Sequence, residues 1–116
     1  MLNRIFVYGS LRRAHDNEFA RLLHDSSTFL GEARMRGCKQ QIGEYSGMVP
    51  PPTDADWVDG EVFEMRDPGG MLKQLDAYEG PDYTREIQPA LLSGGQPLDC
   101  WVYLYLPKVV NRADQT

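Results

Sequence analysis

The chain has 116 residues, of which 41% are hydrophobic and 25% are charged, as is typical of one globular domain with a single core. Its formal net charge of −5 argues against nucleic acid as the main partner, because phosphate binding requires a basic face. No apolar run is long enough to span a membrane, and the run in residues 1–7 is too short for a secretory signal.

The first expected element is a short buried strand that ends at Val7, because residues 5–7 are β-branched or aromatic. The chain then passes into Tyr8-Gly9-Ser10-Leu11, which we call the opening turn. Glycine at such a break permits a sharp turn or the close approach of another molecule, and backbone N–H groups at a strand exit can hold a carboxylate or an oxyanion. An ordinary strand-to-loop transition is the alternative.

The next elements are a helix and two strands. Residues 17–24 carry apolar side chains at helical spacing, and Asp16 or Asn17 is suited to the N-cap. Residues 29–36 and 38–45 are expected to form strands. His15 and His24 have no companion ligands at metal-binding spacing, so no metal site is expected. Cys38 and Cys100 are isolated and indicate reduced thiols in a cytoplasmic protein, with a disulfide between them as the alternative.

The second half alternates strands with one helix. Residues 48–52 are expected to be irregular because they contain three consecutive prolines. Residues 57–65 predict a strand in which Gly60 marks a bulge or a close backbone contact. Asp67 and Pro68 are typical of a helix start, and Gly80 with Pro81 is typical of its end, with the glycine in a left-handed cap. Two further strands are expected over residues 84–92 and 98–106.

These elements predict a mixed α/β fold of the α+β class. We expect a small, curled or barrel-like mixed sheet of five to six strands flanked by two short helices. Residues 1–107 should form a single domain, and the polar segment 108–116 should form a flexible tail.

Glu79 is the second residue that the sequence singles out, because it closes the predicted helix. A carboxylate at a helix C-terminus faces the negative end of the helix dipole, which disfavours its charge and raises its pKa. Such a group exchanges protons well near neutral pH. The alternative is a solvated surface glutamate paired with Lys73 or Arg85, and Asp76, one turn earlier, is a rival carboxylate.

Taken in order, these motifs resemble the γ-glutamylcyclotransferase-like family, which includes the γ-glutamylamine cyclotransferases. The likeness covers residues 5–105 and lies in Val7-Tyr8-Gly9-Ser10-Leu11, Asn17, Val58-Asp59-Gly60-Glu61-Val62-Phe63, Leu75-Asp76-Ala77-Tyr78-Glu79-Gly80 with Tyr83-Thr84-Arg85, and Tyr103. Two segments depart from the family pattern: Tyr45-Ser46-Gly47 replaces a tyrosine-proline-glycine-like segment, and Lys39-Gln40 replaces a leucine-tyrosine pair. Both departures fall where the leaving-group side of a pocket would be shaped, so they affect the substrate more than the chemistry.

The resemblance implies an acyltransferase-type enzyme that releases 5-oxoproline from a γ-glutamyl amine or γ-glutamyl amino acid. Glu79 matches the family's catalytic glutamate, which acts as general acid and base. The substrate-binding residues would be Tyr8, Gly9, Ser10, Leu11, Tyr83 and Tyr103. The resemblance implies neither a metal nor an organic cofactor, and it implies a small γ-glutamyl substrate as the partner. Nucleic acid and a membrane are not expected as partners, for the reasons of charge and apolar length given above.

Two other functions compete with this one. The same pocket without turnover would make a binding module for a small carboxylate-bearing metabolite. A phosphate-binding enzyme built on the opening turn is disfavoured, because no Gly-Lys-Ser/Thr run or second nearby glycine follows Gly9. The sequence does not indicate the oligomeric state.

Overall fold

The computed structural model of this protein describes residues 1–42, 45–50 and 56–106. The expected tail at 108–116 and most of the proline run lie outside these residues. The helices are α1 (Glu18–Asp25) and α2 (Pro68–Glu79), and the strands are β1 (Arg4–Val7), β2 (Ser27–Arg36), β3 (Cys38–Ile42), β4 (Tyr45–Val49), β5 (Trp57–Met65), β6 (Tyr83–Leu92) and β7 (Pro97–Tyr105). No helix within the described ranges is long and apolar enough to cross a membrane.

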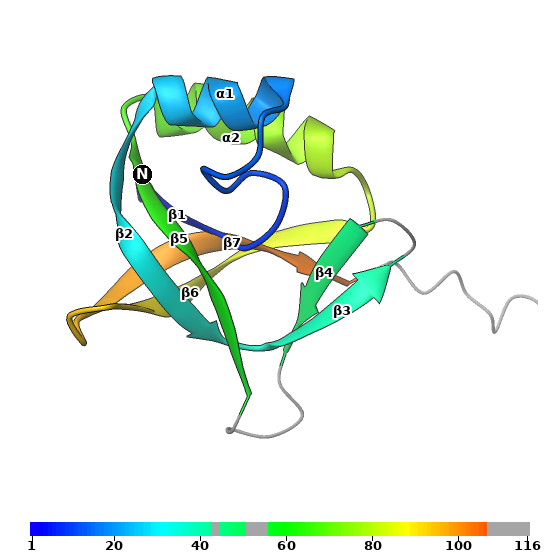
Figure 1. Ribbon diagram of the computed structural model, residues 1–116. Helices are drawn as coiled ribbons and strands as arrows, with labels where there is room; N and C mark the ends of the chain where they lie inside the picture. The colour runs from blue at the N-terminus through cyan, green and yellow to red at the C-terminus, as the bar shows by residue number, and fades with distance from the viewer. Residues whose placement is uncertain (43–44, 51–55, 107–116) are drawn as a thin grey trace, which may run out of the picture.

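Five strands close into a barrel in the order β1–β5–β2–β6–β7 (Figure 1). Neighbouring strands are antiparallel, except that β1 and β7 close the barrel in parallel. The two remaining strands, β3 and β4, form a separate antiparallel hairpin that lies against β5 and β7. The predicted α+β class and the barrel-like mixed sheet with two helices are therefore confirmed.

The hairpin corrects one expectation. Residues 38–45 were expected as one strand and residues 48–52 as irregular, but β4 includes Met48 and Val49, which pair with Lys39 and Cys38. The Met48 side chain is fully buried in the barrel core, and this burial favours pairing up to the residue before the first proline. The strand therefore ends at Val49, directly before Pro50, and the proline run does not exclude Met48 and Val49 from it.

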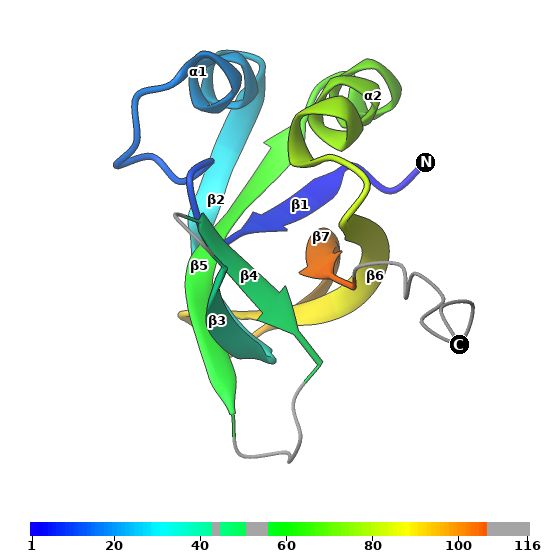
Figure 2. The same cartoon turned by 90° about the vertical axis from the view of Figure 1, so that its right-hand side faces the viewer.

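Both helices lie side by side over one end of the barrel, as Figures 1 and 2 show. The side chain of Asn17 caps α1 by accepting the N–H of Ala20 at 2.8 Å, and Asp67 caps α2 by accepting the N–H of Gly70 at 3.3 Å. The buried face of α2 consists of Met71, Leu72 and Leu75. The predicted positions of both helices are confirmed.

Gly80 ends α2 in a way that differs in detail from the expected left-handed cap. Its φ of 86° is positive as expected, but its ψ of −179° is extended. The following residue is Pro81, whose ring disfavours helical ψ in the residue before it. This combination of φ and ψ is essentially restricted to glycine, and it directs the chain straight out of the helix beside Glu79.

The strand β1 divides the core into two parts. Its Phe6 side chain packs inside the barrel, whereas Ile5 and Val7 pack in the layer beneath the helices. Gly60 of β5 lies directly against this strand, because a Cβ there would be 2.4 Å from the carbonyl oxygen of Val7. The close backbone contact expected at Gly60 is thus confirmed, while the register shift lies on β2 between Phe29 and Gly31. The opening turn leaves β1 at the junction of the two core layers.

Candidate active site

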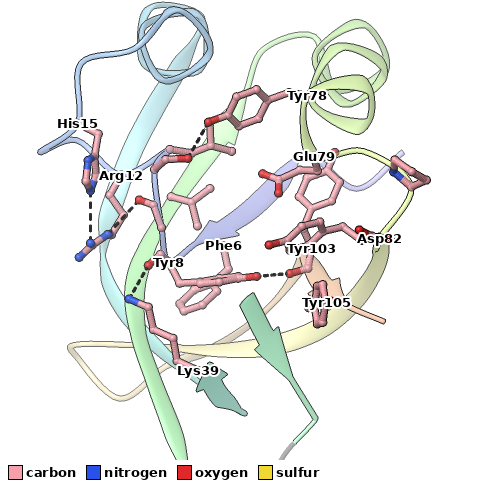
Figure 3. A pocket seen from close by; sticks show the side chains of 16 residues that line it. Phe6, Tyr8, Arg12, His15, Lys39, Tyr78, Glu79, Asp82, Tyr103 and Tyr105 are labelled. Atoms are coloured by element: carbon pink, nitrogen blue, oxygen red, sulfur yellow. Dashed lines mark hydrogen bonds between the residues drawn. The ribbon is translucent and has the colours of Figure 1, made fainter. Parts of the chain in front are cut away.

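One cavity of about 520 Å³ lies where the opening turn, the C-terminal end of α2, the start of β6 and the end of β7 meet. This volume is within the usual range for a small-molecule site. All seven residues singled out from the sequence line it, namely Tyr8, Gly9, Ser10, Leu11, Glu79, Tyr83 and Tyr103. Figure 3 shows the side chains of 16 residues that line the cavity.

Each carbonyl oxygen of the opening turn accepts a hydrogen bond from another part of the protein. Lys39 Nζ donates to the oxygen of Tyr8 at 3.2 Å, and the N–H and Nε of Arg12 donate to that of Gly9 at 3.1 and 3.2 Å. Asn17 Nδ2 donates to the oxygen of Ser10, and His24 Nε2 to that of Leu11, both at 2.8 Å.

These bonds leave the N–H groups of the turn as donors. Among the described residues, no backbone acceptor receives the N–H of Gly9, Ser10 or Leu11. Because a trans peptide directs its N–H and C=O to opposite sides, fixing the carbonyls of residues 8–10 also fixes the directions of the N–H groups that follow them. Successive backbone N–H groups held in fixed directions are suited to binding an anion.

The absence of a side chain at Gly9 is not required by the protein itself. Its φ is not among the positive values found at Gly31, Gly80 and Gly95 in the described chain. A Cβ at Gly9 would meet no protein atom within 4 Å. Neither backbone conformation nor packing therefore requires glycine here, and the space beside the turn is open.

The Tyr8 hydroxyl fastens the turn to two strands. It donates to the carbonyl oxygen of Tyr103 at 2.7 Å and accepts the N–H of Met48 at 3.0 Å. Burial raises the pKa of this phenol well above its ordinary value of 10. The side chain of Tyr8 is thus a neutral connection between β4 and β7.

Ser10 links the opening turn to the helix that carries Glu79. Its hydroxyl lies 2.7 Å from that of Tyr78, and the Tyr78 ring stacks on Phe19 of α1 at 4.6 Å between ring centroids. The turn and the end of α2 are therefore held in register by direct contact.

Glu79 is the last residue of α2 and faces the cavity (Figure 3). Within the described part of the chain, its carboxyl group forms no ion pair and accepts no hydrogen bond. Burial raises its pKa from the ordinary 4.5 to about 7. A carboxyl group with this pKa is divided between its two protonation states near neutral pH, as a general acid and base must be.

The rival carboxylate, Asp76, has the opposite environment. Arg85 donates to both of its oxygens, at 2.8 and 3.0 Å, and the Tyr103 hydroxyl donates to Oδ1 at 2.6 Å. The hydrogen bonds from Arg85 hold the pKa of Asp76 below its usual range, although partial burial opposes them. The expected alternative, a solvated Glu79 paired with Arg85, is wrong, because Arg85 pairs with Asp76.

Tyr83 and Tyr103 complete the wall around Glu79. Burial raises the pKa of both phenols, and the carboxylate of Glu79 adds to the effect in each case. No group of three or more His, Cys, Asp or Glu side chains suited to a metal ion occurs in residues 1–42, 45–50 and 56–106.

A family model described as "Gamma-glutamyl cyclotransferase, AIG2-like" matches residues 5–116 of this chain. The chain belongs to this family. A Drosophila melanogaster protein named "Putative gamma-glutamylcyclotransferase CG2811" is 30% identical over 115 residues, covering 90% of this chain and 70% of that protein.

Two solved structures share the fold of this chain. The crystal structure of an AIG2-like protein from Mus musculus matches with a TM-score of 0.72 and 26% identity, covering 88% of this chain and 76% of that one. The crystal structure of YkqA from Bacillus subtilis shows the same fold, with a TM-score of 0.74 at 24% identity. The match covers 94% of this chain but only 38% of the YkqA chain.

Sequence reasoning missed several residues of the cavity in this family member. Besides the seven expected residues, the lining comprises Phe6, Val7, Arg12, His15, Lys39, Tyr78, Pro81, Asp82 and Tyr105. Two of these carried a signal: Arg12 gives a local positive charge beside the turn, and Lys39 departs from the family pattern. Lys39 reaches this wall from β3, and the sequence pattern did not predict the pairing of β3 with β4.

Proposed function

We propose that this protein is a γ-glutamyl cyclotransferase that converts a γ-glutamyl compound into 5-oxoproline and a free amine or amino acid. The α-nitrogen of the substrate attacks its own γ-carbonyl carbon, so that a ring C–N bond forms and the C–N bond to the leaving group breaks. The ring nitrogen loses two protons and the leaving nitrogen gains two. The enzyme therefore ends each cycle in the protonation state in which it began.

One observation carries this proposal: the carboxyl group of Glu79, whose pKa is raised to about 7, shares a cavity with the opening turn and its N–H groups. The Glu79 carboxylate takes a proton from the α-ammonium group and delivers it to the leaving nitrogen. A positioned acid–base group of this kind contributes about 10²- to 10⁴-fold to the rate.

The opening turn supports the second requirement, which is to hold negative charge. The N–H groups of Gly9, Ser10 and Leu11 are suited to the α-carboxylate of the glutamyl group or to the oxyanion that develops at the γ-carbon. Tyr83 and Tyr103 shape the wall beside Glu79. Because nucleophile and electrophile belong to one molecule, the main task of the protein is to hold the substrate in a ring-forming conformation.

We place this reaction in the cytoplasm, and the free thiols of Cys38 and Cys100 support that compartment. The expected disulfide alternative is wrong, because both cysteines are unpaired.

Production of 5-oxoproline from a panel of γ-glutamyl amino acids and γ-glutamyl amines tests the function. We expect Glu79→Gln to lower kcat about 10²- to 10⁴-fold, because an amide of the same shape cannot carry the proton. Glu86→Gln, at an exposed position of β6, is the matched control and should retain full activity. Full activity in Glu79→Gln would refute the role of Glu79. Thermal stabilisation by 5-oxoproline without turnover of any donor would instead identify a binding module.

A further inference from the structure

Three basic side chains gather on one wall of the cavity: Arg12, His15 and Lys39. Figure 3 shows them together on the side away from Glu79 and Tyr105. Arg12 Nη2 lies 3.4 Å from His15 Nε2. In a chain whose net charge is −5, this wall is a local concentration of positive charge.

No carboxylate in the described part of the chain forms an ion pair with Arg12 or Lys39. The hydrogen-bond acceptors of both cations are neutral carbonyl groups, since Arg12 donates to the carbonyl of Gly9 and Lys39 to that of Tyr8. Burial is the main cause that lowers the pKa of Lys39, and the neighbouring Arg12 cation is the second. The carboxylate of Asp59 raises this pKa, but by less. Two like charges that disfavour one another are stabilised when an anion lies between them.

The N–H groups of the opening turn and the two cations, Arg12 and Lys39, face different ways. Arg12 and Lys39 hold carbonyl oxygens of the opening turn, and a trans peptide directs its N–H away from its C=O. A carboxylate at the N–H groups of Gly9 to Leu11 therefore does not also lie between the two cations. The cavity offers separate places for two negative groups.

The volume of the cavity leaves room for a second group. If each heavy atom is assigned the volume of one water molecule in the liquid, a glutamyl group fills at most about 270 Å³. The cavity holds about 520 Å³. In the cyclising substrate, the α-carboxylate and the leaving group flank the ring nitrogen on opposite sides. A leaving group therefore extends away from the carboxylate that the turn holds.

We propose that Lys39, together with Arg12, forms a subsite for a carboxylate carried by the leaving group. The preferred substrates are then γ-glutamyl amino acids or peptides, which carry a second carboxylate, over γ-glutamyl amines whose leaving group is neutral or cationic. This inference rests on the proposed function and names its substrate class. It also accounts for the position of Lys39, where the sequence departs from the family pattern on the leaving-group side.

The test compares two substrates that differ only in that carboxylate, γ-glutamyl-L-alanine and γ-glutamyl-ethylamide. We expect the wild-type kcat/KM to favour γ-glutamyl-L-alanine about tenfold or more, as is typical for a hydrogen bond to a charged group. Lys39→Met should lower this ratio about tenfold, mainly by raising the KM for γ-glutamyl-L-alanine. Any effect of the substitution that is equal for both substrates cancels in the ratio. Lys39→Arg should restore the ratio, and Lys39→Glu should favour a cationic leaving group such as that of γ-glutamyl-putrescine.

Lys73→Met, on the exposed surface of α2 outside the cavity, is the matched control and should keep the wild-type ratio. An equal fall for both substrates in Lys39→Met would overturn the subsite and show that Lys39 only holds the turn. If the wild type formed no 5-oxoproline from any donor, the proposed function would fail separately. The subsite would still be tested by calorimetric binding of the two compounds to Glu79→Gln, where equal Kd values would refute it.

Discussion

Arg85 binds Asp76 through two parallel hydrogen bonds of 2.8 and 3.0 Å, whereas Glu79, three residues further along α2, pairs with no cation of the described residues. The pKa of Asp76 is held low by this contact, whereas burial alone raises the pKa of Glu79 to about 7. The pKa values of two carboxyl groups one helical turn apart are thus shifted in opposite directions. This separation is the usual way in which a protein assigns one carboxylate to a fixed charge and another to proton transfer.

The rate of 5-oxoproline formation should depend on pH through Glu79. We expect kcat/KM to rise with pH with an apparent pKa of about 7, because only the ionised carboxylate can accept a proton from the substrate. The profile is measured from pH 5 to 9 at constant ionic strength. The residual kcat/KM of Glu79→Gln should not show this rise near pH 7. The same rise in that variant would assign the titration to another group.

Glu79 should also make the folded state less stable as the pH rises. Its pKa is about 7 in the folded protein and about 4.5 when exposed, so the folded state binds more protons between these values. The contribution of protonated Glu79 to the free energy of unfolding is fully present below pH 4.5, and it is lost as the pH rises through 7. Relative to wild type, Glu79→Gln should gain of order 2 kcal/mol in the free energy of unfolding between pH 4.5 and pH 8.

Urea unfolding of both proteins at a series of pH values measures this difference. Glu86→Gln again serves as the control, since an exposed glutamate on β6 should show no such trend. A difference that stays constant across the series would mean that Glu79 is solvated in the folded protein.

Asp76 should show the opposite dependence. Its pKa is lowered in the folded state, so the stability that it contributes is present above its ordinary value of 3.8 and is lost as the pH falls through the folded value. Asp76→Asn should lower the free energy of unfolding at pH 7 by about 1 kcal/mol, because the ion pair with Arg85 is partly exposed. This deficit should shrink on acidification, and a deficit that grew instead would contradict the pairing. Thermal unfolding at pH 3 and pH 7 measures it.

Removing one hydroxyl should weaken the attachment of the opening turn to the barrel. Tyr8→Phe leaves the N–H of Met48 and the C=O of Tyr103 without their buried partner. We expect a loss of about 1–3 kcal/mol in the free energy of unfolding in urea. Tyr105→Phe is the matched control, because the Tyr105 hydroxyl forms no hydrogen bond in the described part of the chain, and its stability should be unchanged. Equal stability of the two variants would show that the Tyr8 bonds add nothing.

The features that sequence predicted correctly are those set by local chemistry. The caps at Asn17 and Asp67, the strand at Trp57–Met65 and the position of Glu79 at the end of α2 follow from residue types at short spacing. Both Asp76 and Glu79 lie within reach of Arg85 by spacing, and only the fold decides between them.

The features that sequence missed depend on contacts between distant segments. Lys39 lies in a Lys-Gln-Gln stretch with no apolar periodicity, and its ammonium group reaches the carbonyl of Tyr8 from β3, which pairs with β4. Met48 was assigned to an irregular segment because of the prolines that follow it, although its side chain is completely buried in the barrel. Burial in a core that other strands complete was not visible in the local pattern.

Gly9 and Gly60 differ in the space that surrounds them, so the same substitution to alanine should have different effects at the two positions. At Gly60, an added Cβ would lie 2.4 Å from the oxygen of Val7 and 2.6 Å from the Phe6 ring, so Gly60→Ala must push β5 from β1. We expect Gly60→Ala to lose about 3 kcal/mol or more in the free energy of unfolding, or to fail to fold. At Gly9 an added Cβ would meet no protein atom, so Gly9→Ala should fold with stability close to that of wild type.

The effect of Gly9→Ala should appear instead in turnover. A methyl group beside the N–H donors of the opening turn occupies space that a bound carboxylate needs, so we expect kcat/KM for 5-oxoproline formation to fall about tenfold or more. Gly69→Ala, at a second glycine with open space around it but on α2 outside the cavity, is the control and should keep full activity. Gly9→Ala with wild-type stability and wild-type kcat/KM would show that no ligand approaches this turn closely.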